Sequence, residues 1–244
     1  MNRVLIFLMS SLIYHTIDAQ SISGFEEVEF VTTDDIKISA SYGLAKSTIP
    51  AAAIILIHQG GSSREEWFAL DLVKDLLDNG FAILAYDVRT HGKSGKDQGN
   101  LTDLFGNPNR APLDLKAALD FLKSDTRVDS TRIGILGASI GANLACVAAS
   151  SDSYPVKSVV SISAKVTAIE SLGTVKSPTL RNAFHIASAE EQNGLRRGWA
   201  EELYANTSGH RAVHIADGRL HGSYILRENS PLQREVLAWF KKTL

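Results

Sequence analysis

The pentapeptide GASIG, residues 137–141, joins two contrasting segments of the chain. The apolar run RIGIL at residues 132–136 precedes it and is typical of a buried strand, while the small-residue run ANLACVAA at residues 142–149 is typical of a helix. A serine at the apex of such a strand–turn–helix has a strained backbone, and flanking glycines keep side chains out of the crowded turn. The sequence therefore predicts a sharp turn that exposes the hydroxyl of Ser139.

Apolar runs and helical patterns alternate along the rest of the chain. Buried strands are expected at residues 51–57, 81–86, 133–136, 156–162, 182–187 and 211–215, and helices at residues 64–78, 113–123, 142–149, 195–206 and 231–242. An alternating apolar and polar pattern before them, at residues 25–42, predicts an antiparallel hairpin. The expected fold class is α/β, with a mostly parallel central sheet covered by helices on both faces and an N-terminal antiparallel hairpin. The connections are too short for a large cap domain.

The first residues have the pattern of a secretory signal peptide. Arg3 precedes a short apolar core at residues 4–13, and Ala19 provides a small residue at a plausible cleavage point. The core is shorter than the about 20 residues of a membrane-spanning helix. We therefore expect a signal peptide at residues 1–19, a secreted or periplasmic location, no membrane span after signal removal, and a single α/β domain at residues 20–244. An uncleaved anchor is the alternative.

The charge and the cysteine content of the chain argue against a nucleic-acid partner and against an internal disulfide. The formal net charge is −2, so the chain offers no electrostatic basis for a nucleic-acid partner. Its single cysteine, Cys146, cannot form an internal disulfide and is expected to be a buried packing residue.

A serine hydroxyl is a poor nucleophile unless a base accepts its proton and a carboxylate orients that base. His221 stands in the loop directly after the last expected strand. The other histidines lie within strands, in earlier loops or in the signal segment. Two carboxylates, Glu190 and Glu191, follow the strand before it, and Asp217 lies four residues before His221. We predict Glu191 as the orienting acid, with Glu190 and Asp217 as alternatives.

The oxyanion that forms during acyl transfer needs fixed hydrogen-bond donors. The backbone N–H of Ile140, directly after Ser139, is the first expected donor. The loop HQGG at residues 58–61 follows an expected strand and is expected to supply the second donor through Gln59. A mere tight turn is the alternative interpretation of its two glycines.

These segments together resemble the α/β-hydrolase superfamily, and in particular its lid-poor branch of dienelactone-hydrolase-like proteins and simple carboxylesterases. The resemblance rests on HQGG at residues 58–61, DVRTHGKS at residues 87–94, GASIG at residues 137–141 and the chain order serine, acid, histidine. It implies the following roles: Ser139 as nucleophile, His221 as base, Gln59 and Ile140 as oxyanion donors, and Asp87 and Arg89 as structural residues.

Two departures from that family pattern matter. The acid is most often Asp in the family and here is expected to be Glu191, and dienelactone hydrolases proper have Cys where this chain has Ser139. The expected activity is therefore hydrolysis of small-molecule carboxylic esters through an acyl-enzyme on Ser139, without a metal or organic cofactor. The site is expected to be open and lined by Trp67, Phe68 and residues 90–112. A serine peptidase of the same fold and a catalytically inactive binding module remain alternatives.

Overall fold

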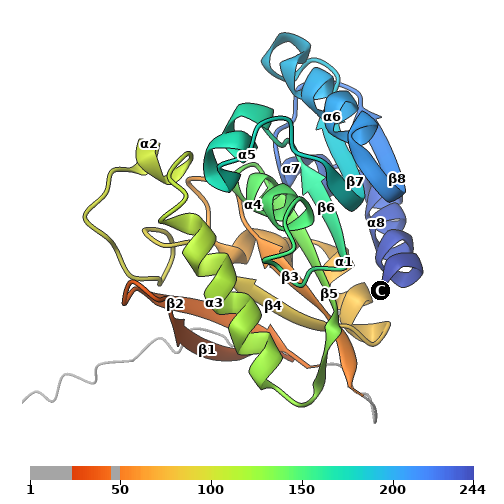
Figure 1. Cartoon of the computed structure of the whole chain (residues 1–244). Helices are drawn as coiled ribbons and strands as arrows, with labels where there is room; N and C mark the ends of the chain where they lie inside the picture. The colour runs from red at the N-terminus through yellow and green to blue at the C-terminus, as the bar shows by residue number, and fades with distance from the viewer. Residues whose placement is uncertain (1–23, 45–49) are drawn as a thin grey trace, which may run out of the picture.

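The computed structural model describes residues 24–44 and 50–244, so the expected signal peptide lies outside the described residues. Eight strands form one sheet in the order β1-β2-β4-β3-β5-β6-β7-β8 (Figure 1). They are β1 (Glu26–Val31), β2 (Lys37–Gly43), β3 (Ala51–Ile57), β4 (Ala82–Tyr86), β5 (Val128–Ala138), β6 (Ser158–Ile162), β7 (Leu180–Ser188) and β8 (Thr207–Ala216). The pairs β1–β2 and β2–β4 are antiparallel and all other pairs are parallel. The predicted α/β class with an antiparallel N-terminal hairpin is confirmed.

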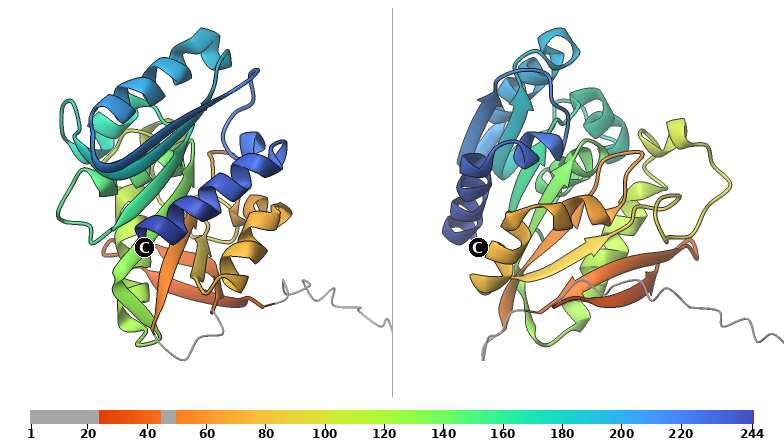
Figure 2. Two further views of the ribbon diagram at one scale, coloured as in Figure 1. Left: turned by 90° about the vertical axis from the view of Figure 1, so that its right-hand side faces the viewer. Right: turned by 180° about the vertical axis from the view of Figure 1, so that it is seen from behind.

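Helices cover both faces of the sheet (Figure 2). Residues of α3 (Ala111–Ser124), α4 (Ile140–Ala149), α5 (Val166–Gly173) and α6 (Leu195–Ala205) belong to one hydrophobic core. Residues of α1 (Asp71–Asp78), α7 (Tyr224–Arg227) and α8 (Ser230–Thr243) belong to a second core on the other face. Among the described residues no separate cap domain covers the sheet.

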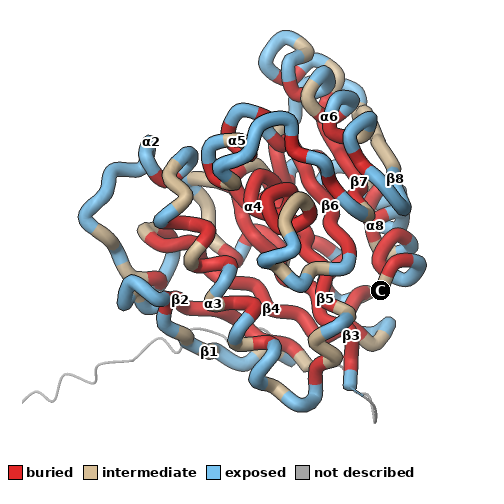
Figure 3. The backbone as a smooth tube through the Cα atoms, viewed as in Figure 1, coloured by how far each residue is buried: buried red, intermediate tan, exposed pale blue. Residues whose placement is uncertain are grey.

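The central strands separate these two cores, which explains their unbroken apolar sequences. Every residue of β3 is buried (Figure 3). Its side chains alternate between the two cores. Ile55 and Ile57 pack with the first core, whereas Ile54 and Leu56 pack with the second. A strand with both faces covered has no need for polar residues, so its sequence shows no alternation.

The helix predicted at residues 64–78 is wrong as a single element. The structure has a 3₁₀ helix, η1 (Arg64–Ala69), followed by α1, and the extended backbone of Leu70 (φ −107°, ψ 133°) separates them. Leu70 and Trp67 are both buried in the second core. The break explains why apolar residues at helical spacing overestimate the length of the helix here.

Three short α-helices, α2 (Leu101–Leu104), α5 and α7, and the 3₁₀ helix η2 (Glu191–Gly194) were not predicted. The helix α2 lies inside the long irregular segment at residues 90–112, and α5 fills the connection between β6 and β7. Within the described ranges, every helix is too short or too polar to cross a membrane. These short helices matter for the site, because α2 and α5 supply residues near Ser139.

Candidate active site

Ser139 lies at the turn between β5 and α4 with φ 51° and ψ −106°. Residues with a side chain rarely adopt this conformation, and it costs about 1–3 kcal/mol. The flanking glycines are required by contact: a Cβ on Gly137 would lie 2.1 Å from the carbonyl oxygen of Gly141, and one on Gly141 would lie 2.1 Å from the carbonyl oxygen of Ile57. The packing of α4 against β3 and β5 therefore leaves no room for side chains beside the elbow.

Glu191 and His221 are brought together by the neighbouring strands β7 and β8. The distance from His221 Nδ1 to Glu191 Oε1 is 2.5 Å. The Glu191 side chain is 6% exposed and the His221 side chain is 39% exposed. A carboxylate that accepts the Nδ1–H proton leaves Nε2 as the basic nitrogen of the ring. The pair thus has the arrangement of an oriented general base.

The two alternative acids lie elsewhere. Glu190 is exposed, and its Oε2 lies 2.9 Å from Nε of Arg219. Asp217 is also exposed, with no hydrogen bond to His221 among the described residues. Of the three carboxylates considered from the sequence, the structure places only Glu191 against the imidazole.

The loop that carries His221 adjoins the elbow. A Cβ on Gly222 would lie 3.5 Å from the Cβ of Ala138, which precedes Ser139. Between the described side chains of Ser139 and His221 there is no hydrogen bond. Catalytic hydrogen bonds of this kind are often long in the absence of substrate and shorten when substrate binds.

Two further residues hold Glu191, and sequence reasoning missed both. Ser163 follows β6 with a positive φ of 57°, donates its hydroxyl to Glu191 Oε2 at 2.7 Å, and accepts the N–H of Gly222 at 3.0 Å. Arg196, near the start of α6, lies with Nε 3.2 Å from Glu191 Oε1 and donates from Nη1 to the carbonyl oxygen of Ser163 at 2.7 Å. Burial lowers the pKa of Arg196. Because β6 lies between β5 and β7, a polar residue at its carboxyl end is the signal that could have identified Ser163.

The oxyanion loop differs from expectation at Gln59. Its backbone N–H donates to Oε1 of the buried Glu66 at 3.1 Å, and its side-chain Oε1 accepts the N–H of Ser223 at 3.3 Å. The Gln59 N–H is therefore not free to bind an oxyanion in this structure. Burial raises the pKa of Glu66. Ile140 is the first residue of α4, and the first N–H groups of a helix have no acceptor within the helix.

The residues His58, Asp87 and Arg89 have structural roles. His58 donates Nδ1–H to the carbonyl oxygen of Gln59 at 2.7 Å and accepts the N–H of Val88 on Nε2 at 2.9 Å, which fixes a neutral ring. Burial lowers the pKa of His58 to about 4. The carboxylate of Asp87 accepts from Arg64 at 2.6 Å and from the N–H of Lys93 at 2.8 Å.

Arg89 is fully buried and is the centre of an ion-pair network. Its Nε donates to Asp114 at 2.8 Å, and its Nη1 lies 2.7 Å from Asp34 and 3.2 Å from Asp97. These contacts connect the loop after β4 to the hairpin and to α3, so they brace the segment at residues 90–112, which contains α2.

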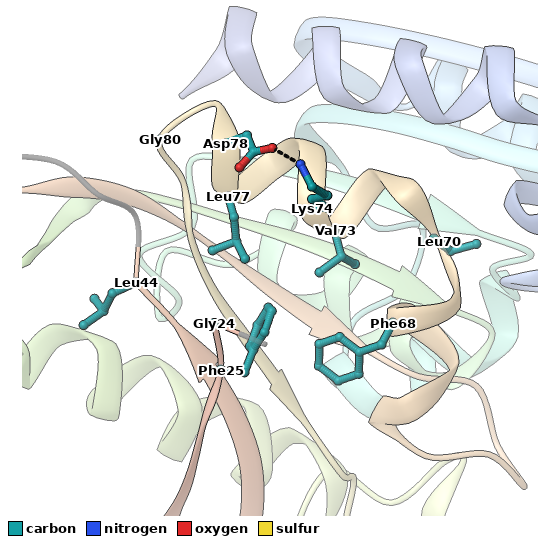
Figure 4. A pocket seen from close by; sticks show the side chains of 10 residues that line it. All are labelled: Gly24, Phe25, Leu44, Phe68, Leu70, Val73, Lys74, Leu77, Asp78 and Gly80. Carbon is teal, nitrogen blue, oxygen red and sulfur yellow. Dashed lines mark hydrogen bonds and ion pairs between the residues drawn. The ribbon is translucent and has the colours of Figure 1, made fainter. Parts of the chain in front are cut away.

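A cavity of about 520 Å³ contains Ser139 and Ile140. Phe105 and its neighbours in residues 90–112 line it, in agreement with the sequence analysis, but Trp67 and Phe68 do not. Trp67 is fully buried, and Phe68 lines a separate cavity of about 560 Å³ between α1 and the start of β1 (Figure 4). The described residues contain no cluster of three or more His, Cys, Asp or Glu side chains suited to a metal ion.

Comparison with known proteins shows where this architecture belongs. The model of the alpha/beta hydrolase fold family matches residues 52–232. The chain is 36% identical over 112 residues to the uncharacterized protein YcjY of Escherichia coli (strain K12), a match that covers 46% of this chain and 35% of that protein. It is 32% identical over 127 residues to a thiohydrolase of Eupenicillium brefeldianum, with 52% of this chain and 39% of that protein covered. The matches thus span little more than a third of each of these two relatives.

Solved structures share the fold at low sequence identity. Esterase Pf2001 of Pyrococcus furiosus superposes with a TM-score of 0.70 at 21% identity, over 90% of this chain and 92% of that one. Acetyl xylan esterase 1 of Thermoanaerobacterium sp. JW/SL YS485 superposes with a TM-score of 0.67 at 16% identity, over 92% and 86% of the two chains. With a family model that matches most of its length and with this topology, the chain belongs to the alpha/beta hydrolase fold family.

Proposed function

We propose that this hydrolase-fold protein is a serine hydrolase that cleaves carboxylic esters through an acyl-enzyme on Ser139. The observation that carries the proposal is the 2.5 Å contact between Glu191 Oε1 and His221 Nδ1. The loop of His221 adjoins Ser139, whose backbone conformation is strained. A conformation that costs stability is retained most simply where it positions a reactive group. The likeness to esterase structures is a further, fold-level support.

The proposed chemistry assigns one role to each residue. His221 accepts the proton of the Ser139 hydroxyl through Nε2 while the serine oxygen attacks the ester carbonyl, and it then protonates the leaving alcohol. Glu191 holds the ring and stabilises the imidazolium. Water, activated by His221, then releases the acyl group from Ser139.

Two backbone amides are proposed to bind the oxyanion. The N–H of Ile140, at the start of α4, is the first. Because the Gln59 N–H already donates to Glu66, we propose the next amide of the same loop, that of Gly60, as the second. A Cβ on Gly60 would lie 2.9 Å from the ring of Phe105, a residue of the Ser139 cavity, so the Gly60 backbone borders that cavity.

A serine-directed probe tests the proposal directly. A fluorophosphonate is expected to label the wild-type protein covalently, and Ser139→Ala is expected to abolish labelling. A folded wild-type protein that stays unlabelled contradicts the proposal. A panel of p-nitrophenyl esters and anilides of graded acyl length, with one thioester included because of the match to a thiohydrolase, measures which carbonyl derivative is cleaved fastest. Anilide turnover equal to ester turnover would favour a peptidase.

A further inference from the structure

Among the described residues that line the cavity at Ser139, every charged side chain is basic and none is acidic. Its two charged residues are Lys165 and Arg196, and its other polar side chains include Thr102, Asn143, Thr167 and Ser171. A purely hydrocarbon acyl chain in this cavity would remove water from the Lys165 ammonium group without giving it a partner, at a cost in binding free energy. The composition of the cavity instead suits a substrate with a charged or strongly polar end.

The charge of Arg196 is already compensated, whereas that of Lys165 is not. Arg196 lies 3.2 Å from Glu191. Lys165 is exposed, and within the described part of the chain no carboxylate lies within ion-pair distance of its ammonium group. Lys165 is therefore the uncompensated cation of the cavity.

The backbone around Lys165 adds to the positive potential. Lys165 is the N-cap residue of α5, and its own N–H is held by Asn143 Oδ1 at 2.8 Å. Ile140 at the start of α4, and Lys165 and Thr167 at the start of α5, line the cavity, and the N-terminus of a helix favours negative charge. Two helix starts and one uncompensated lysine thus surround the space next to Ser139.

The position of His221 shows which part of an ester would occupy this space. The leaving alcohol must lie next to the base that protonates it. The cavity is lined by Ser139 but, among the described residues, not by His221. The alcohol therefore departs on the other side of the serine, and the cavity receives the acyl part.

We propose that the acyl part of the substrate ends in a carboxylate that binds Lys165, so that the substrate class is the monoester of a dicarboxylic acid. This inference rests on the proposed ester hydrolysis. It assigns Lys165 a role in specificity rather than in the chemical step, since the ammonium pairs with a group remote from the scissile carbonyl.

Two esters that differ in one charge provide the test. Mono-p-nitrophenyl glutarate and p-nitrophenyl pentanoate have acyl groups of equal carbon number, and the ratio of their kcat/KM values isolates the effect of the carboxylate. We expect the wild-type ratio to exceed one by about tenfold at low ionic strength and to fall with added salt. Lys165→Gln is expected to lower the ratio about tenfold, and Lys165→Glu to lower it further. Lys176→Gln, at an exposed lysine outside the cavity, is the matched control and is expected to leave it unchanged.

Each outcome separates this inference from the proposed function. A ratio near one in the wild type, or an equal ratio in Lys165→Gln, overturns the inference while ester turnover itself remains. If neither ester is cleaved, binding replaces turnover as the measurement: calorimetry with monomethyl glutarate on Ser139→Ala and on the Ser139→Ala/Lys165→Gln double variant. About tenfold weaker binding to the double variant supports the carboxylate site, and equal affinity overturns it.

Discussion

The Glu191 carboxylate approaches within 2.5 Å of the His221 imidazole across 30 positions of sequence. The two residues meet because β7 and β8 are parallel neighbours, so the loops that follow them leave the sheet at the same edge. Glu191 is almost fully buried there, whereas Glu190 is exposed. One residue of difference in sequence therefore decides which carboxylate can orient the ring.

Replacing Glu191 tests this relationship. We expect Glu191→Gln to lower kcat by about 10⁴-fold with the fold intact, because the amide no longer fixes the tautomer or stabilises the imidazolium. Steady-state hydrolysis of a p-nitrophenyl ester, with circular dichroism to check folding, measures the effect.

Glu190→Gln is the matched control, since it removes a neighbouring carboxylate of the same length. We expect nearly normal kcat, because an exposed ion pair such as the one with Arg219 contributes little. Loss of activity in Glu190→Gln and not in Glu191→Gln would transfer the role to Glu190. Two active variants would exclude both.

Ser163 is expected to act through Glu191 rather than on substrate. Its hydroxyl bonds both Glu191 Oε2 and the N–H of Gly222, so its loss loosens the acid and the loop of the base together. We predict that Ser163→Ala lowers kcat by about 10- to 100-fold, in line with the ~1.5–3 kcal/mol typical of a hydrogen bond to a charged group. The measurement is kcat and KM separately, with KM expected to change little.

Ser163→Gly distinguishes the hydroxyl from the backbone. Glycine tolerates the positive φ of this position and also lacks the hydroxyl. A similar loss of kcat in both variants assigns the effect to the hydroxyl. Normal kcat in Ser163→Gly would mean that backbone conformation alone matters.

The sheet could be predicted from sequence because its signals are local. The run of apolar residues at 51–57 has no other economical interpretation than a strand covered on both faces, and the structure buries all seven residues. The lengths of the helices were harder to predict from the sequence. The break at Leu70 depends on burial in the second core, which is a tertiary contact that periodicity does not report.

Some features of the site could likewise be predicted from the sequence, and others could not. The elbow at Ser139 is encoded by adjacent residues, and the close contacts of Gly137 and Gly141 explain that pattern. Ser163 was missed because its position at the carboxyl end of β6 indicates only that it lies near the site, and its bond to Glu191, 28 positions away, leaves no local pattern. The engagement of the Gln59 N–H by Glu66 likewise depends on how η1 packs against the loop, and the sequence carries no signal for it.

His185 predicts how stability depends on pH. It is fully buried between the hydroxyls of Ser161 and Thr207, and burial lowers its pKa from 6.5 to about 3. Between those values the unfolded chain binds a proton that the folded chain does not, so the free energy of unfolding falls as pH decreases below about 6.5. One such group contributes a slope of at most about 1.4 kcal/mol per pH unit.

Urea unfolding at pH 7, 6 and 5 measures this slope. We expect His185→Gln to reduce the slope relative to wild type, while His210→Gln, at an exposed histidine, leaves it unchanged. His58, whose pKa burial also lowers, keeps part of the slope in both variants. Identical slopes in His185→Gln and wild type would mean that His185 does not become protonated on unfolding in this range.

Cys146 is expected to be unreactive in the native protein. It is fully buried in α4, and burial raises the pKa of its thiol to about 12, so that almost no thiolate exists near neutral pH. We predict that an aromatic disulfide reagent at pH 8 releases no thiolate from the folded protein and one equivalent in urea. Ser153→Cys, at an exposed position beyond the end of α4, is expected to react in the folded state and so controls for the reagent. Labelling of wild type at equal rates with and without urea would show that Cys146 is accessible and that the core around α4 opens, which would undermine the rigid placement of Ser139 at its N-terminus.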